Sequence, residues 1–577
     1  MFVKRNAKDF FEKKIYLLVT ALIGISFALG MRLFYLQVTC ADQLFKQSLY
    51  NFTRYENTNS LRGEIVDCHG TLLATNSPVT NVYWQGTGNK KLTPEQIRDV
   101  TTLCTLFNLA IDEKELAYAE RFGKKIKLFS DIPFERLSTL IELFPHHPNI
   151  MLENNFKRLY PYKECAGQIL GYLTTIETGY EGTTGLEKIC NDELRGEPGS
   201  IMRVINSFGL PLQEKVLKPT LKGNRIQTTL DFELQTIAEE IFPQEYTGVM
   251  IIMDPKDGAI KTLVSRPSFD PNLFVNGISK EDWNMLKDKK PFLNRACQSL
   301  YPPGSIFKLI TLTSLLETGL ITPESKFYCR GRTFLGRDYR CHKQEGHGPL
   351  NPAQSLVQSC NIMFYELAKK MDIDTLAHYA KKFGLGESTA SIFKENTGLV
   401  PSRAWKRKVK GERWWQGETL SAAIGQSYLL VTPLQVARMV GAIETGYLVN
   451  PRILEESPII HEPLGIRPET RQFLKRAMHS VAEEGTARRL YYPSQFRIEA
   501  KTSTAQTSAL ENKELGTKHW EHGWLAANIC HKDGTPLTFV VLIEHAGSSS
   551  ISVALAKQFL RRYVQLLKNK QPSPPHA

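Results

Sequence analysis

The sequence predicts an α+β protein with a single N-terminal transmembrane helix, an elongated mixed α/β stalk and a compact domain whose antiparallel sheet is flanked by helices. Three observations lead to this prediction. A long apolar stretch follows a basic N-terminus, the next region mixes short strands with charged helices and glycine turns, and two late β-hairpins enclose a long helical middle. With 577 residues and 42% hydrophobic content, the chain can fill the cores of about two to four domains.

The N-terminal segment predicts a cytoplasmic tail, residues 1–14, followed by a transmembrane anchor, residues 15–38. The chain is uncharged from Ile15 to Met31, and Arg32 lies near the outer end, where its side chain can snorkel. At about 1.5 Å rise per residue, this segment crosses a hydrocarbon layer of about 30 Å. A cleaved signal peptide is the alternative, but no small-x-small cleavage site follows. The cations that precede the apolar stretch predict a cytoplasmic N-terminus.

The rest of the chain divides into an expected stalk, residues 39–230, and an expected compact domain, residues 231–577. The stalk region holds charged helices such as "TPEQIRDVTTLCTLFNL" and several glycine turns. The compact domain begins with a helix and the hairpin "GVMIIMDPKDGAIKTLVSRP", and it ends with the strands "GWLAANIC" and "LTFVVLIEH" and the amphipathic helix "VALAKQFLRRYVQLLKN". Because the hairpins lie at both ends, the sheet must be assembled from distant parts of the chain.

The net charge of +13 raises the question of nucleic-acid binding. The lysines and arginines are spread along the whole chain, and no basic run is interleaved with aromatic residues as a strand-binding groove would require. We therefore expect no nucleic-acid partner.

The stretch "YPPGSIFKLIT" places a serine at the start of an expected helix and a lysine one turn later. In one interpretation Ser305 is a nucleophile: the free N–H groups of the helix N-terminus would stabilise the developing oxyanion, and Lys308 would take the proton of the serine. In the other, Ser305 is an N-cap and Lys308 an ordinary lysine, because serine is a favoured N-cap residue. The stretch alone favours the N-cap.

Two later stretches favour the nucleophile. "VQSCNIMFY" supplies Ser359 and Asn361, and "IEAKTSTAQT" supplies Lys501 and the threonines beside it. In this order, the three stretches resemble the motifs Ser-x-x-Lys, Ser-x-Asn and Lys-Thr-Gly of the penicillin-binding proteins and serine β-lactamases. The resemblance implies a penicillin-binding transpeptidase domain with a five-stranded antiparallel sheet flanked by helices.

The resemblance also implies a chemistry. Ser305 would attack the carbonyl of the penultimate D-Ala of a stem peptide and release the terminal D-Ala, with Lys308 as the acylation base. Ser359 and Lys501 would relay the proton towards the leaving amine. An amino group of a second stem peptide would then attack the ester and form the cross-link, so β-lactams would be inhibitors. The chemistry requires no cofactor.

The remaining motif residues would hold the substrate. Asn361 would bind the peptide amide, Thr502 the substrate carboxylate, and the backbone N–H groups of Ser305 and Thr504 would form the oxyanion hole. Ser503 stands where the family has glycine. Since side chains alternate along a strand, Ser503 should point to the same side as Lys501, and we expect retained activity with altered β-lactam sensitivity.

Similarity to class B penicillin-binding proteins covers nearly the whole chain. "LRGEIVDCHGTLLATN" resembles their Arg-Gly-x-Ile-x-Asp-Arg-x-Gly stretch, with Cys68 at a usual arginine, and "GTTGLEK" resembles Gly-x-x-Gly-x-Glu of the pedestal, or dimerisation-type, domain. "IGQSYLLVTPLQ" is similar to Ile-Gly-Gln-Gly…Thr-Pro-Leu-Gln, with Ser427 at a usual glycine. "HGPLNPAQSLVQSCN" and "RAWKRKVKGERWWQGETLSAAIG" resemble the elongation branch, called penicillin-binding protein 2.

The elongation branch implies a location and partners. The chain would be a single-pass protein of the inner membrane with its catalytic domain in the periplasm. Its substrates would be peptidoglycan stem peptides. Its protein partners would be a multi-pass glycan polymerase of the shape, elongation, division and sporulation family and a scaffold protein of the rod complex.

Ten cysteines are many for an exported protein. Cys329, Cys341, His347 and Cys360 form a Cys3His set that suits tetrahedral zinc, and His342 competes with His347 for the nitrogen position. A disulfide between Cys329 and Cys341 and free thiols are the alternatives. A zinc ion bound to Cys360 would hold Ser359 and Asn361 in place.

Two other functions share this fold. A β-lactamase would need a base that activates water, and we find no convincing Glu-x-x-Leu-Asn stretch in the helical insertion. A non-catalytic scaffold or a penicillin-sensing receptor would keep the fold for binding, and Ser503 and the missing stalk arginine at Cys68 favour it. The intact serines and lysines of the three motifs favour the enzyme.

Overall fold

The computed structural model describes residues 3–107, 111–145, 147–176, 179–205, 211–275, 277–490, 495–506, 520–532 and 534–570. Contacts divide the chain into two units. Unit 1 contains Met1–Leu61, Pro78–Lys157 and Glu197–Leu221, and unit 2 contains Arg62–Ser77, Arg158–Gly196 and Lys222–Ala577. Part of the range expected for the stalk therefore packs with the later domain, because the chain passes between the units several times.

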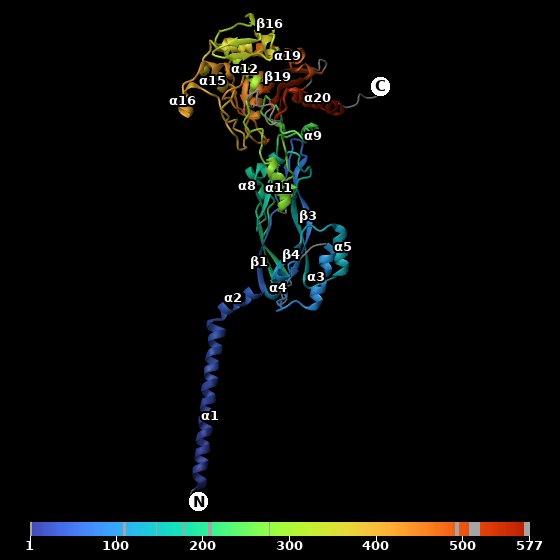
Figure 1. The fold of residues 1–577 in the computed structure, drawn as a ribbon. Helices are drawn as coiled ribbons and strands as arrows, with labels where there is room; N and C mark the ends of the chain where they lie inside the picture. Colours follow the sequence, from blue (N-terminus) through green and yellow to red (C-terminus); the bar gives the residue numbers. More distant parts are fainter. Residues whose placement is uncertain are drawn as a thin grey trace. The chain divides into compact units, whose positions relative to one another are not determined.

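Unit 1 begins with the apolar helix that the sequence predicts. Helix α1, Val3–Phe34, continues through a π-helical turn, Tyr35–Thr39, and is followed by α2, Ala41–Phe52 (Figure 1). The stretch Phe10–Thr39 has a mean hydropathy of 2.0, and none of its most apolar part is buried. Within the described residues, it is the one helix long and apolar enough to cross a membrane.

The rest of unit 1 contains two sheets and small apolar cores. Strands β1 (Thr53–Thr58), β8 (Gly199–Ile205) and β9 (Pro211–Lys218) form an antiparallel sheet. The second half of β3 (Leu72–Gln85) pairs with β4 (Lys125–Phe129), and α3 (Pro94–Phe107), α4 (Glu113–Phe122), α5 (Phe134–Leu143) and most of β5 (Ile150–Leu159) complete the unit. Two clusters of buried side chains lie among these elements, one around Val82 and Phe129 and one around Trp84.

Unit 2 begins with short elements that a buried ion-pair network holds together. They are β2 (Ile65–Val66), the first half of β3, α6 (Gly167–Leu170), β6 (Leu173–Ile176), β7 (Gly179–Gly182), α7 (Gly185–Ile189), α8 (Asn191–Arg195) and β10 (Ile226–Gln227). The carboxylate of Glu187 is fully buried and accepts from Arg62 Nε at 2.6 Å, Arg158 Nε at 2.7 Å and Tyr160 OH at 3.0 Å. Arg62 lies in the stretch "LRGEIV" and Glu187 in "GTTGLEK", so this ion pair joins two of the stretches that carry the family resemblance.

The five-stranded antiparallel sheet that the sequence resemblance implies is present in unit 2. Its order is β12-β11-β21-β20-β19, and every neighbouring pair is antiparallel. The strands are β11 (Gly248–Met253), β12 (Ile260–Arg266), β19 (Phe496–Ala505), β20 (His522–His531) and β21 (Leu537–Ile543). Nearly every residue of β11, β20 and β21 is buried, so helices must cover both faces of the sheet.

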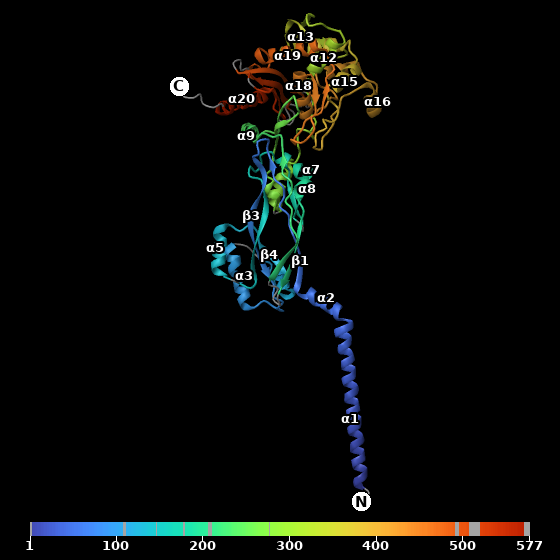
Figure 2. The same cartoon turned by 180° about the vertical axis from the view of Figure 1, so that it is seen from behind.

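The helices that contact this sheet come from both ends of unit 2. Helices α9 (Phe232–Ile241) and α20 (Ser550–Lys570) contact one another as well as strands of the sheet, and both views place them side by side (Figures 1 and 2). Helix α18 (Pro433–Thr445) contacts the central strands, and α19 (Pro468–Glu483) packs on β19 and on α12 (Lys308–Glu317). Strand β19 lies at the open edge of the sheet.

The remaining elements of unit 2 are short and lie between β12 and β19 along the chain. They are α10 (Asn272–Val275), α11 (Lys280–Lys289), the 3-10 turn η2 (Gly304–Phe307), β13 (Phe327–Cys329), β14 (Arg332–Phe334), β15 (Asp338–Arg340), β16 (Gly348–Leu350), α13 (Pro352–Val357), α14 (Ile362–Ala368), α15 (Ile373–Lys382), α16 (Arg403–Lys410), α17 (Gln416–Ala423), β17 (Tyr447–Val449), β18 (His461–Pro463) and the 3-10 turn η3 (Arg488–Leu490).

Candidate active site

Ser305 lies in a tight turn that leads into a buried helix. The sequence predicts a helix starting at this serine, whereas the structure has the 3-10 turn η2 before α12 begins at Lys308. Gly304 opens the turn with a φ of +52°, and its N–H donates to the carbonyl of Gly425. A Cβ on Gly304 would lie 2.3 Å from Ser503 Oγ, so only glycine fits between the turn and β19.

The three predicted motifs meet at Ser305. Ser359 Oγ donates to Ser305 Oγ at 3.1 Å, and Lys501 Nζ donates to Ser359 Oγ at 3.2 Å. Lys308 Nζ donates to the Ser359 carbonyl at 2.8 Å and to Asn361 Oδ1 at 2.7 Å. Among the described residues, no hydrogen bond joins Lys308 to Ser305, and the hydroxyl of Ser359 lies between Ser305 and the two amines.

Ser359 reaches this position through an uncommon backbone conformation. It follows α13 and has a φ of +51°, a left-handed value that non-glycine residues rarely adopt. The N–H of Cys360 then donates to the Ser355 carbonyl, and α14 begins after Asn361. This turn places Ser359 and Asn361 beside Lys308, at a strain that the surrounding contacts must offset.

Burial lowers the pKa of both lysines. Lys308 is fully buried above the ring of Phe364, and this burial lowers its pKa to about 8. The pKa of Lys501 is lowered well below its ordinary value, first by burial and second by the charge of Lys308. In the described part of the chain, no carboxylate forms an ion pair with either amine. Near pH 8, part of the Lys308 population therefore carries a neutral amine close to Ser305.

Strand β19 carries the third motif along the edge of the sheet. Thr502 Oγ1 donates to Thr486 Oγ1 at 2.6 Å, and Thr504 is exposed. The backbone N–H of Ser305 donates to Ser503 Oγ at 2.8 Å. The expected orientation of Ser503 is confirmed, since it faces the same group of residues as Lys501. The Ser503 hydroxyl oxygen therefore accepts the hydrogen bond that the Ser305 N–H would have to donate to an oxyanion.

These residues line a cavity of about 590 Å³. The residues of the three motifs that line it are Ser305, Ser359, Asn361, Thr502, Ser503 and Thr504. Sequence reasoning missed Thr486, Arg340 and Glu521, which also line it. No short motif surrounds these three residues, so only their place in the fold brings them to the cavity.

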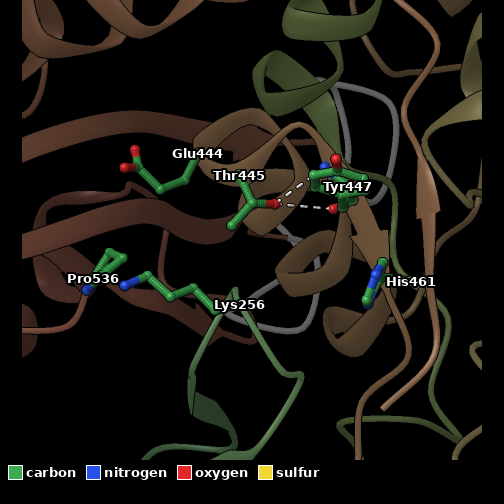
Figure 3. A pocket seen from close by; sticks show the side chains of 6 residues that line it. All are labelled: Lys256, Glu444, Thr445, Tyr447, His461 and Pro536. Carbon is green, nitrogen blue, oxygen red and sulfur yellow. Dashed lines mark hydrogen bonds between the residues drawn. The ribbon is translucent and has the colours of Figure 1, made fainter.

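A second cavity, of about 450 Å³, lies around the end of α18 and is drawn in Figure 3. Thr445 Oγ1 donates to the carbonyl of Tyr447, and Glu444 is paired with Lys475 at 2.8 Å. Lys256 and His461 project from other segments (Figure 3). Among its lining residues, no hydroxyl is hydrogen bonded to a basic side chain, so this cavity lacks the arrangement seen at Ser305.

Four predicted metal ligands come together at the second predicted motif. The ligand atoms of Cys329, Cys341, His347 and Cys360 all lie within 4.8 Å of one another. Cys341 Sγ lies 3.5 Å from His347 Nδ1, close to the ligand separation of about 3.5 Å that tetrahedral zinc with sulfur and nitrogen ligands requires. All ten cysteines are free, so the structure contains no Cys329 to Cys341 disulfide. The set includes His347 and not His342.

Cys68, which stands at a usual arginine of the related sequences, lies in a second group with His69 and Asp231. In this group the His69 ring lies 3.4 Å from the Asp231 carboxylate, and the His69 side chain is exposed.

Two family models match the chain. The model described as "Penicillin binding protein transpeptidase domain" matches residues 248–561, and the model described as "Penicillin-binding Protein dimerisation domain" matches residues 57–228.

Curated relatives match over most of the chain. "Peptidoglycan D,D-transpeptidase MrdA" of Haemophilus influenzae is 28% identical over 97% of this chain and 93% of its own length. The protein of the same name from Escherichia coli is 30% identical over 82% of this chain and 83% of its own length.

Solved structures share the fold. A "Complex between Penicillin-Binding Protein (PBP2) and MreC from Helicobacter pylori" has a TM-score of 0.77 at 27% identity and covers 89% of this chain and 99% of that one. A chain from "Structural coordination of polymerization and crosslinking by a peptidoglycan synthase complex" has a TM-score of 0.75 at 28% identity and covers 98% of this chain and 100% of that one.

Proposed function

Because this chain belongs to the penicillin-binding protein transpeptidase family, we propose that it is a serine D,D-transpeptidase that cross-links peptidoglycan stem peptides during elongation of the cell wall. The observation that carries the proposal is the hydrogen-bonded chain from Ser305 through Ser359 to the amine of Lys501, with the buried Lys308 beside it.

In the first step, Ser305 Oγ attacks the carbonyl carbon of the penultimate D-Ala and passes its proton to a neutral amine. Lys308 is suited to accept it, since burial lowers its pKa to about 8, and Ser359 bridges the gap between the two side chains. The tetrahedral intermediate collapses when its C–N bond breaks. The proton returns through Ser359 to the leaving amine, and D-Ala departs, leaving an ester on Ser305.

The remaining motif residues position the peptide. Asn361 Oδ1 accepts a hydrogen bond of 2.7 Å from Lys308 Nζ, and Asn361 lines the cavity, where its side-chain amide can bind the peptide backbone. Thr502 and Thr504 lie on the open edge of the sheet, where they can bind the substrate carboxylate and the developing oxyanion. An amine of a second stem peptide then attacks the ester carbonyl, loses a proton to the same relay and releases Ser305.

Labelling of the full-length protein with a fluorescent penicillin tests this assignment. We expect wild type to be acylated on Ser305, the Ser305→Ala variant to give no label, and a Ser421→Ala variant, altered at a serine outside the cavity on α17, to label normally. A folded wild-type protein that takes no label would refute the assignment.

We propose in addition that Cys329, Cys341, His347 and Cys360 hold one structural zinc ion. Three thiolates and one imidazole are the donors that structural zinc prefers, and three of the four residues are buried. The N–H of Asn361 donates to Cys341 Sγ at 3.4 Å, so a fixed Cys341 would also fix the second motif. We expect one zinc per chain by elemental analysis, a loss of zinc in Cys360→Ser, and normal zinc content in Cys530→Ser. A metal-free, fully active wild type would contradict this.

The apolar α1 and the similar structures support a place and partners for the chain. We propose that residues 15–38 anchor it in the inner membrane with the N-terminus in the cytoplasm, that residues 39–230 form a periplasmic pedestal domain, and that residues 231–577 form the transpeptidase domain. We propose that it assembles with a multi-pass glycan polymerase and with a rod-complex scaffold, as the names of the similar complexes suggest. Co-purification of the polymerase with wild type, and its loss when α1 is exchanged for an unrelated anchor, would test this.

A further inference from the structure

A cysteine, a histidine and an aspartate come together where a hairpin turn of unit 2 contacts the start of α9. Cys68 and His69 are the two central residues of the turn, residues 67–70, that joins β2 to β3. The Gly70 N–H donates to the Asp67 carbonyl and closes this turn. Asp231 is the N-cap residue of α9. The ligand atoms of Cys68, His69 and Asp231 all lie within 4.8 Å of one another.

Hydrogen bonds fix the turn against the start of α9. The Cys68 N–H donates to the Leu230 carbonyl at 2.8 Å. The Phe232 N–H donates to Asp67 Oδ2 at 3.1 Å, and Asp67 Oδ1 accepts from the His69 N–H at 2.9 Å. Because the backbone of both segments is already held in place, a ligand bound between them pays little to order it.

The donor atoms have the spacing of a zinc site. His69 Nε2 lies 3.4 Å from Asp231 Oδ2. Zinc bonds of about 2.0 to 2.2 Å at a tetrahedral angle place a nitrogen and an oxygen ligand about 3.3 to 3.5 Å apart. The other oxygen, Asp231 Oδ1, accepts from the Leu234 N–H and caps α9, so capping and metal binding use different atoms of the same carboxylate.

The charges around the turn also favour a bound cation. Cys68 stands at a usual arginine of the related sequences, so the turn has lost one positive charge beside the carboxylates of Asp67 and Asp231. Zinc carries two positive charges, which the Cys68 thiolate and the Asp231 carboxylate would balance. A bound zinc ion would therefore restore a cation at the position of the arginine.

We propose that Cys68, His69 and Asp231 bind one zinc ion and that this ion ties the turn between β2 and β3 to α9. The His69 side chain is exposed, so the ion can enter from solvent. With three protein ligands and an accessible fourth position, the site should bind zinc more weakly than the Cys3His group and should fill only when zinc is added to the purified protein. This proposal is independent of the proposed catalytic function and of the zinc proposed at Cys360.

Alkylation of individual cysteines, read by peptide mass spectrometry, tests the site in the full-length protein. Reduced protein is treated with iodoacetamide in zinc-free buffer or with zinc chloride. We expect added zinc to slow the alkylation of Cys68 by about tenfold or more, because a thiolate bound to the metal is withdrawn from the reaction. Cys104, a partly buried cysteine on α3 outside both groups of metal ligands, should react at the same rate in both buffers.

Variants identify the ligands. In His69→Ala and in Asp231→Asn we expect zinc to give Cys68 no protection. Asparagine is as good an N-cap as aspartate, so Asp231→Asn keeps the start of α9 and removes the charge of the ligand. His378→Ala removes an exposed histidine on α15 and should leave the protection unchanged. Thermal denaturation in zinc-free buffer, which we expect to match that of wild type, checks that each variant is folded.

Equilibrium dialysis against zinc chloride provides a second measurement that needs no reaction of Cys68. Wild type should bind one more zinc ion per chain than Cys68→Ala, whatever the occupancy of the Cys3His group. Equal zinc binding by wild type and Cys68→Ala would overturn the proposal. Alkylation of wild-type Cys68 at the same rate with and without zinc, or protection that persists in His69→Ala, would overturn it as well.

Discussion

Replacing Ser503 by glycine should accelerate acylation of Ser305. The Ser305 N–H is one of the two donors expected to stabilise the oxyanion, and in the structure it donates to Ser503 Oγ at 2.8 Å. A substrate carbonyl must therefore displace an internal acceptor before this N–H can stabilise the developing charge. Ser503 is 2% exposed and lies against Gly304, so its hydroxyl has little room to move aside.

The size of the effect follows from the one hydrogen bond that is broken. A neutral hydrogen bond contributes about 0.5 to 1.5 kcal/mol net, and about 1.4 kcal/mol changes a rate tenfold. If the whole free energy of breaking this hydrogen bond adds to the acylation barrier of wild type, Ser503→Gly should be acylated about 2 to 12 times faster than wild type. The same substitution should lower the stability of the strand by about 0.5 to 1 kcal/mol, because glycine is less favourable within a strand.

The assay is the second-order rate constant for labelling by a fluorescent penicillin, and Ser503→Ala is the matched control. Alanine removes the hydroxyl and keeps the Cβ. If the hydroxyl is the competitor, both variants should react faster, whereas if the Cβ crowds the site, only glycine should. The reasoning fails if neither variant reacts faster, and a slower reaction in both would show that the hydroxyl assists catalysis.

Three further predictions follow from the site and its surroundings. The acylation rate should rise with pH through about 8 and then level off, because Lys308 must be neutral to accept a proton and burial lowers its pKa; a rate still rising steeply at pH 10 would argue for an unshifted lysine. Glu187→Gln should lower the free energy of unfolding by about 3 to 5 kcal/mol, measured by thermal denaturation, because Arg62 and Arg158 lose their buried carboxylate. Ser427→Gly should raise stability by about 1 kcal/mol, because Ser427 has a φ of +69°, while Ser427→Ala should bring no such gain.

The sequence predicted which residues of the candidate site lie together because each belongs to a short motif. Ser305, Ser359 and Lys501 were expected to meet, and the structure joins them by hydrogen bonds of 3.1 and 3.2 Å. The family resemblance implied the five-stranded antiparallel sheet, and the residue types and their order predicted the Cys3His group. These features depend on which residues are present and on the family resemblance, and both are visible in the sequence.

Other features depend on tertiary packing, and local patterns carry no signal for them. The 3-10 turn before α12 exists because Gly304 fits between β19 and the Gly425 carbonyl, a contact between segments far apart in the chain. The division into two interleaved units reflects repeated chain crossings that composition does not reveal. Thr486 lines the active-site cavity and accepts a hydrogen bond from Thr502, although it lies outside the three motifs.

The two segments that carry serines at usual glycines both contact the turn that contains Ser305. Ser503 accepts the N–H of Ser305, while Gly425, two residues before Ser427, accepts the N–H of Gly304. A Cβ on Gly425 would lie 2.0 Å from the Gly304 carbonyl oxygen, so the segment that contains Ser427 and the turn that contains Ser305 are in direct contact. The added hydroxyl and the strained backbone therefore belong to segments that contact one structural element, the turn that contains Ser305. Changes in β-lactam reactivity relative to other members of the family should originate there, and not in the lysines and the serine relay, which are intact.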